Sequence, residues 1–206
     1  MTIDEKLKAF FEGKKVVILG FGREGRSTLK LLGSCNCKSI TVADMNLVPE
    51  SETEGCTLCC GEDYLTCLDD CDVIMKAPGV ILKNIVSDEI KAKISSQTGL
   101  FLRFCDNMII GITGTKGKST TSSLIKFFIE KSGKDTMLIG NIGVPPLERR
   151  EEFTKDCVIV CEMSCHQLEY VKASPDVAVL LNIYPEHLDH YTDFAAYRNA
   201  KLNIFR

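Results

Sequence analysis

The sequence predicts an α/β fold built from two consecutive domains, each containing a parallel sheet. Short apolar runs alternate with segments of helical spacing along the 206 residues of the chain. Two glycine-rich loops, at 20–25 and 111–117, each follow an apolar run and precede a helical segment. An apolar fraction of 45% is sufficient to supply both cores.

The first domain is predicted to cover residues 1–105. From Lys14 to Asp44 the chain has the pattern of a strand, a glycine-rich turn, a helix and a second strand, which is a βαβ unit. Strands are expected at 16–19, 40–43, 57–59, 73–75 and 100–102, with a helix over 84–93 between the last two.

The second domain is predicted to cover residues 106–206. A strand at 108–112 leads through the second glycine loop into a helix over 118–131, which Gly133 is expected to end. Further strands are expected at 136–139, 158–161 and 177–183, and a last helix begins near Asp193. Within the 118–131 helix, one apolar stripe is predicted from Leu124, Ile125, Phe128 and Ile129.

The net charge and the composition of the N-terminus indicate what kind of binding partner to expect. The net charge is -3 with no long run of one sign, which predicts neither nucleic-acid binding nor attraction to an anionic membrane. The first residues lack a signal-peptide pattern, and no apolar run approaches the length of a membrane span. We therefore expect a cytoplasmic protein that binds small molecules.

The chain has eleven cysteines, and most of them lie in the first third. A metal cluster is one interpretation, but the C-x-C and C-x-x-C-C spacings differ from common zinc motifs. The alternative is that these thiols pack as small hydrophobic groups, and disulfides are not expected in a cytoplasmic chain. The crowded residues are Cys35, Cys37, Cys56, Cys59, Cys60, Cys67 and Cys71.

The first glycine loop has the spacing Gly20-x-Gly22-x-x-Gly25 between a strand and a helix, and Asp44 ends the next strand. Such glycines let backbone N–H groups approach a diphosphate at the helix N-terminus, which predicts a Rossmann-like domain. The spacing alone is compatible with NAD, with another diphosphate-linked nucleotide, or with close helix–strand packing and no ligand.

The second loop ends in Gly117-Lys118-Ser119-Thr120 after an apolar strand. This sequence is typical of a P-loop, in which backbone N–H groups surround phosphates, the lysine binds the terminal phosphates and the serine hydroxyl binds Mg²⁺. The general pattern requires glycine where Ile112 stands, so the loop is a variant. It predicts a P-loop ATPase α/β domain.

Several stretches together resemble the Mur ligases, the ATP-dependent amide-forming ligases of peptidoglycan precursor synthesis. The first loop most resembles that of the members that add D-glutamate to UDP-MurNAc-L-Ala. The resemblance implies an N-terminal fragment, with part of the central ATPase domain and without the third domain, that is inactive alone. The stretches, in the order of the family, are 19–27, 77–80, 113–120, 140–143, 162–169, 182–189 and 197–201.

The resemblance also implies roles for individual residues. ATP binding is implied for Gly114, Thr115, Lys116, Gly117, Lys118, Ser119 and Thr120, and catalysis for Lys118, Glu162, His187 and Lys201. Mg²⁺ is assigned to Ser119, Glu162, His187 and Lys201, the last as a carbamate formed with CO₂. Contacts with the UDP substrate are implied for Gly22, Arg23, Glu24, Gly25, Asp44, Asn141, Ser164 and Gln167.

The residues themselves leave alternatives open. A carboxylate at Glu24 beside a diphosphate is unfavourable unless the side chain turns away or pairs with Arg23 or Arg26. Ser164 and Gln167 also suit strand-end hydrogen bonding. The roles of Cys165 and His166 stay open, because other family members often carry different residues there. An NAD-dependent oxidoreductase and a non-catalytic nucleotide-binding module are the alternative functions.

Overall fold

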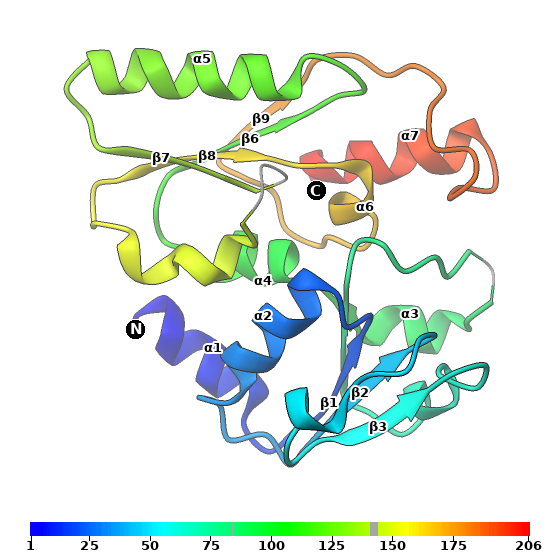
Figure 1. Cartoon of the computed structure of the whole chain (residues 1–206). Coiled ribbons are helices and arrows are strands. Elements are labelled where there is room, and N and C mark those ends of the chain that lie inside the picture. The colour runs from blue at the N-terminus through cyan, green and yellow to red at the C-terminus, as the bar shows by residue number, and fades with distance from the viewer. Residues whose placement is uncertain (84, 141–143) are drawn as a thin grey trace. The chain divides into compact units, whose positions relative to one another are not determined.

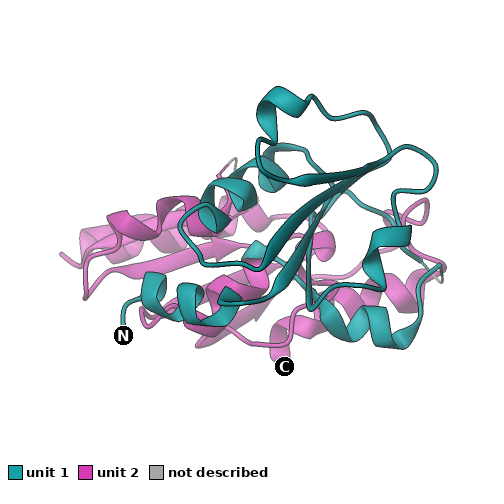
Figure 2. Ribbon diagram, turned by 90° about the horizontal axis from the view of Figure 1, so that it is seen from below, with its two compact units in different colours: residues 1–97 teal, residues 98–206 magenta. Residues whose placement is uncertain are grey.

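A computed structural model of the chain describes residues 1–83, 85–140 and 144–206, and it divides into two compact units (Figure 1). The units are residues 1–97 and 98–206, coloured separately in Figure 2. The division falls before the predicted boundary at Cys105. Each unit is built on its own parallel sheet.

The first unit contains a sheet of five parallel strands. The strands are β1 (Lys15–Leu19), β2 (Ser39–Asp44), β3 (Thr57–Cys60), β4 (Val73–Lys76) and β5 (Ile94–Ser95). Their order is β3-β2-β1-β4-β5, so the chain reverses direction across the sheet between β1 and β4. The carboxyl ends of strands beside such a reversal are where open α/β sheets place ligands.

Three helices belong to this unit: α1 (Ile3–Phe11), α2 (Arg23–Leu32) and α3 (Asp88–Lys93). Helix α1 begins with a capping box, in which Thr2 and Glu5 exchange side-chain and backbone hydrogen bonds. Helix α2 begins after Gly22 and packs on β1 and β4. A Cβ atom on Gly25 would lie 2.2 Å from the Gly20 oxygen, so only glycine fits this crossing.

The second unit contains a four-stranded parallel sheet in the order β7-β8-β6-β9. Its strands are β6 (Ile109–Thr113), β7 (Thr136–Gly140), β8 (Val158–Glu162) and β9 (Val177–Leu180). Its helices are α4 (Gln97–Phe104), whose first residue closes the first unit, α5 (Lys118–Lys131), α6 (Cys165–Leu168) and α7 (Phe194–Leu202).

Helix α5 lies along one face of this sheet and packs on β6, β7 and β8 (Figure 1). Gly133, with a φ of 82°, follows its C-terminal cap as predicted. The prediction of an apolar stripe on α5 is wrong in part, because Leu124 and Phe128 are 51% and 66% exposed. Ser122 is the fully buried residue of this helix instead.

Three other predicted elements need correction. Residues 100–102 are helical, in α4, and do not form the predicted strand. The run is apolar and buried at all three positions, so its sequence has no periodicity that could distinguish a helix from a strand. The helix predicted over 84–93 begins at Asp88, where the Ser87 hydroxyl accepts a hydrogen bond from the Ile90 N–H. The strand predicted over 177–183 ends at Leu180.

The predicted fold class is confirmed, with a Rossmann-like parallel sheet followed by a second α/β unit that carries the P-loop. All eleven cysteines are free thiols in the structure. Among the described residues, no helix combines the length and apolar character needed to cross a bilayer.

Candidate functional site

The P-loop connects β6 to α5, and two of its glycines have unusual backbone geometry. Gly114 and Gly117 have φ angles of 158° and 85°, in the region that favours glycine. A Cβ atom on Gly114 would also lie 3.0 Å from the Leu181 Cβ. Before the loop, the Thr113 hydroxyl donates a hydrogen bond of 2.8 Å to the Met163 carbonyl, which fixes the end of β6.

Two side chains hold the loop in place, one from the segment after β9 and one from α7. The Asn182 Oδ1 accepts a hydrogen bond of 3.0 Å from the Lys116 N–H, and its Nδ2 donates one of 3.1 Å to the Lys116 carbonyl. Thr115 Oγ1 and the Tyr197 hydroxyl share a hydrogen bond of 2.8 Å. The sequence indicated neither support, although Asn182 and Tyr197 both lie in stretches that resemble the family.

Two lysines converge on one carbonyl of this loop. Lys118 Nζ donates hydrogen bonds to the carbonyl oxygens of Gly114, at 2.9 Å, and Thr115, at 3.1 Å. Lys201 Nζ, from α7, donates to the same Gly114 oxygen at 2.8 Å. Gly117, Ser119 and Thr120, at the start of α5, are exposed beside them. Paired cations at the N-terminus of a fourteen-residue helix are a combination that favours the binding of anions.

Lys201 has the environment of a reactive amine rather than of a surface lysine. Only 2% of the residue is exposed, and this burial, aided by the nearby charge of Lys118, lowers the pKa of Lys201 to about 8. Lys201 is therefore not a solvated lysine of the kind usual on helix surfaces. Lys116 behaves differently, since its side chain is 74% exposed and forms an ion pair of 2.6 Å with Glu186, which lowers the pKa of Glu186.

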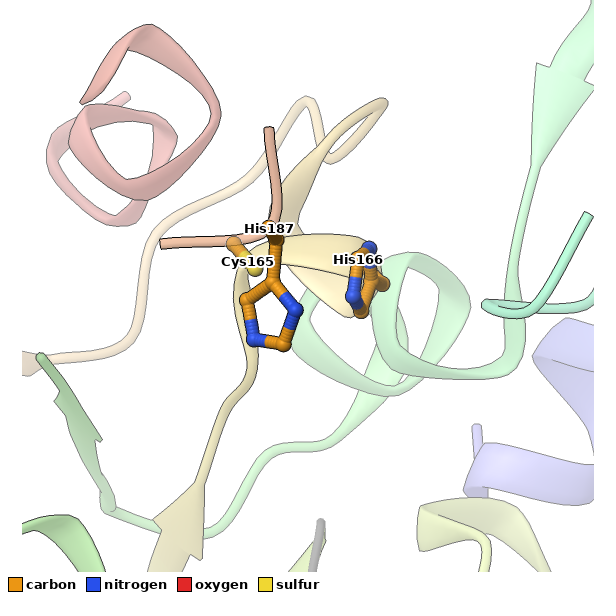
Figure 3. Close-up of side chains that lie close together, drawn as sticks. All are labelled: Cys165, His166 and His187. Atoms are coloured by element: carbon orange, nitrogen blue, oxygen red, sulfur yellow. The ribbon is translucent and has the colours of Figure 1, made fainter. Parts of the chain in front are cut away.

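The structure does not bring all of the predicted metal ligands together in one compact set. Glu162 ends β8 and is 2% exposed, while His187 lies in the loop before α7. Among the described residues, the compact set of possible ligand atoms that contains His187 is completed by Cys165 and His166, not by Glu162 (Figure 3). The metal-binding roles of Ser119, Glu162, His187 and Lys201 therefore stay predictions.

Ser164 and Gln167 form the cap of α6. The Ser164 hydroxyl accepts a hydrogen bond of 3.2 Å from the Gln167 N–H, and the Gln167 Oε1 accepts one of 2.9 Å from the Ser164 N–H. This is the local hydrogen bonding considered as their alternative role. Asn141, the remaining predicted substrate contact of this unit, lies outside the described residues.

The first unit has a pocket of about 460 Å³ at the carboxyl ends of β1, β2 and β4. Gly22, Arg23, Glu24 and Asp44 line it, as do residues 77–81, of which 77–80 form one of the stretches that resemble the family. Gly25 is buried against Gly20, so its function is to let α2 pack closely rather than to face the pocket. The pocket therefore contains four of the five residues predicted from the first loop and β2.

Two carboxyl groups in this pocket have distinct environments. Asp44 holds the loop, because its Oδ2 accepts a hydrogen bond of 2.7 Å from the Phe21 N–H and its Oδ1 accepts one of 2.8 Å from the Asn46 N–H. Burial raises the pKa of Glu24 to about 7, although Lys76 opposes the rise. Arg26, considered as a partner for Glu24, pairs with Glu52 at 2.6 Å instead.

Comparison with known proteins supports the resemblance seen in the sequence. The family model of the Mur ligase middle domain matches residues 112–206, the part of the chain that carries the P-loop. The predicted resemblance to the Mur ligases is therefore confirmed.

The particular relatives are D-glutamate ligases. The UDP-N-acetylmuramoylalanine--D-glutamate ligase of Clostridium botulinum (strain Loch Maree / Type A3) is 36% identical over 211 residues, covering 98% of this chain and 46% of the relative. The same-named ligase of Clostridium kluyveri is 32% identical over 212 residues, with the same coverage. The chain thus spans about half the length of the curated relatives it matches.

Solved structures of Mur ligases also align with the chain. The UDP-N-acetylmuramate:L-alanyl-gamma-D-glutamyl-meso-diaminopimelate ligase from Neisseria meningitides is 18% identical, covers 93% of this chain and 67% of its own, and has a TM-score of 0.47.

Proposed function

We propose that this chain is the nucleotide-binding part of an ATP-dependent amide ligase of peptidoglycan precursor synthesis, one that adds D-glutamate to UDP-MurNAc-L-Ala. The observation that carries the proposal is the convergence of Lys118 and Lys201 on the Gly114 carbonyl beside the start of α5. The names of the relatives support the choice of substrates.

The chemistry of such a ligase needs the cations of this site. A carboxylate is a poor electrophile, so its oxygen first attacks the γ-phosphorus of ATP, which breaks the bond to ADP and gives an acyl phosphate. The amine nitrogen of D-glutamate then attacks the acyl carbon, phosphate leaves, and the nitrogen loses a proton. Both steps build negative charge on phosphoryl oxygens, which positioned cations stabilise.

Each residue of the P-loop has a role in this scheme. Lys118 Nζ would exchange its carbonyl partners for the β- and γ-phosphates, and the exposed N–H groups of the first turn of α5 would bind the same oxygens. The exposed Ser119 hydroxyl, with Glu162, His187 and Lys201, would hold Mg²⁺. That ion neutralises phosphate charge when bound.

Lys201 fits the proposed carbamate. Only a neutral amine attacks CO₂, forming an N–C bond and releasing one proton, and a pKa of about 8 leaves a neutral fraction near physiological pH. The product is an anion, and its oxygens suit Mg²⁺ as an ammonium group does not. Burial of Lys201 thus favours the conversion from cation to metal ligand.

The pocket of the first unit would bind the UDP part of the substrate. The N–H groups at the start of α2 face a diphosphate, and Arg23 adds a positive charge at the same wall. Near pH 7 Glu24 is partly protonated, which reduces the repulsion expected from the sequence. The cytoplasm, where we expect the protein, is consistent with a soluble nucleotide-linked substrate.

The alternative functions make different predictions. An oxidoreductase would bind NAD in the first unit and would leave the paired lysines of the P-loop without a role, and the relatives named above are ligases. A non-catalytic module would bind nucleotide without turnover. Neither alternative explains the buried Lys201 beside the P-loop.

Calorimetric titration tests the proposal directly. We expect the chain to bind the non-hydrolysable ATP analogue AMP-PNP in a Mg²⁺-dependent manner, and Lys118→Ala to weaken binding at least about 100-fold, as expected for the loss of a charge-assisted contact. Lys126→Ala is the matched control, because Lys126 lies on the same helix and pairs with Glu130. Equal affinities of the wild type and Lys118→Ala would refute the ATP site.

A second titration distinguishes the ligands of the first unit. UDP-MurNAc-L-Ala is expected to bind and NAD is not. Binding of NAD alone would refute the ligase assignment, even if the P-loop still bound AMP-PNP.

A further inference from the structure

The three histidines of the chain gather at one place in the second unit, together with a buried cysteine. Cys165, His166 and His187 each offer one ligand atom, and these atoms lie within 4.8 Å of one another. His190 completes the group, with its ring centroid 4.2 Å from that of His166. The chain has only three histidines, so all of its imidazole groups lie in this cluster.

The positions of these side chains follow from two neighbouring segments. Cys165 and His166 are the first residues of α6, and the loop between β9 and α7 brings His187 to them (Figure 3). His187 has a φ of 57°, a conformation that is unfavourable for a residue with a Cβ atom. Its carbonyl accepts hydrogen bonds of 3.1 Å from the N–H groups of His190 and Tyr191, which hold the loop in this conformation.

We propose that Cys165, His166 and His187 form a binding site for Zn²⁺, with a fourth position open to water. One thiolate and two imidazoles are ligands that Zn²⁺ prefers, whereas Mg²⁺ prefers oxygen. A tetrahedral zinc ion would place these ligand atoms roughly 3.5 Å apart, given Zn–S and Zn–N bonds of about 2.3 and 2.0 Å. Rotation of the side chains closes the remaining gap of about 1 Å.

The surroundings of the three residues also suit a zinc ion. The side chain of His187 is 45% exposed, which gives an ion a path from solvent, while Cys165 is 2% exposed and anchors the inner side. Beside the set, His190 Nε2 lies 3.3 Å from the Glu169 carboxylate. The ring of His190, held by this contact, packs against the ring of His166 and so limits the movement of that ligand.

The zinc site overlaps the magnesium site of the proposed function at one residue, because both would use His187. A ring nitrogen that binds zinc is not available to Mg²⁺, so occupation by zinc would compete with that role. The zinc proposal does not depend on the ligase assignment. A binding experiment without substrates therefore tests it alone.

The experiment is a titration of the fully reduced chain with Zn²⁺ in competition with a chromophoric chelator, in the presence of millimolar Mg²⁺. Cys165→Ser and His166→Phe are each expected to lower zinc affinity at least about 100-fold. Cys105→Ser is the matched control, because it makes the same change at another thiol of the same unit. Its zinc affinity is expected to stay within about threefold of the wild type.

Equal zinc affinities in the wild type and both site variants, or an equal loss in Cys105→Ser, would overturn the proposal. A second measurement needs no variant. The imidazole resonances of His166 and His187 in the wild-type chain are expected to shift with one equivalent of Zn²⁺. Resonances that stay unchanged under excess Zn²⁺ would also overturn it.

Discussion

Replacing Glu24 by glutamine tests the electrostatics of the first pocket. Burial raises the pKa of Glu24 from 4.5 to about 7, so its ionised form is less favourable in the folded chain than in the unfolded one. Its contribution to stability is therefore fully present below pH 4.5 and is lost as the pH rises through 7. At about 1.4 kcal/mol per pH unit, the loss reaches roughly 3 kcal/mol, of which about 2 kcal/mol falls between pH 5 and pH 8.

The assay is urea unfolding of the wild type and Glu24→Gln at pH 5 and pH 8. Glutamine keeps the acceptor oxygen and cannot ionise, so the variant is expected to gain about 2 kcal/mol on the wild type over this range. Other titrating groups are common to both proteins and cancel in the difference. Glu89→Gln, at an exposed position of α3, is the control and is expected to track the wild type within about 0.5 kcal/mol. Parallel stability curves for Glu24→Gln and the wild type would show that Glu24 is not desolvated.

Three further changes test separate contacts. Gly25→Ala is expected to destabilise the chain by about 2 kcal/mol or more, because the new methyl group meets the Gly20 oxygen, whereas Gly22→Ala meets no atom within 4 Å and serves as its control in thermal unfolding. Asn182→Ala removes two hydrogen bonds to the P-loop and is expected to cost about 1–3 kcal/mol and to weaken AMP-PNP binding in calorimetry; unchanged binding would contradict the support we assign to it. With ¹³CO₂ at pH 8, the chain is expected to show a carbamate carbon signal by NMR that Lys201→Arg lacks and Lys126→Arg keeps.

Most strands could be predicted because buried parallel strands are short apolar runs between turn residues. Helix α5 was predicted with its observed bounds, since a glycine loop precedes it and Gly133 follows it. Other helices and strands have sequence patterns that are harder to recognise. Helix α1 was not predicted, although Thr2 and Glu5 have the spacing of a capping box, and β5 has two residues, too few for any period.

In the candidate site, local features could be predicted from the sequence, but contacts between residues far apart in the chain could not. The loops at Gly20 and Gly114 could be predicted because local spacing defines them. The support of Thr115 by Tyr197 could not, because the two residues are 82 positions apart and only the fold brings them together. The cluster of Cys165, His166 and His187 likewise depends on the meeting of two loops.

The charges of the two loops differ in a way that matches two different phosphate ligands. Near Gly114 two ammonium groups, Lys118 and Lys201, meet at one carbonyl, which suits the high charge of a triphosphate. Around the first loop, Arg23 and Lys76 are accompanied by Asp44 and by Glu24, whose pKa is about 7, so the positive and negative charges nearly cancel. A diphosphate esterified at both ends carries less charge and needs mainly backbone N–H groups, which the start of α2 provides. Exchange of the two ligands between the loops would be unfavourable on charge alone, and this supports ATP at the second loop and a nucleotide-diphosphate sugar at the first.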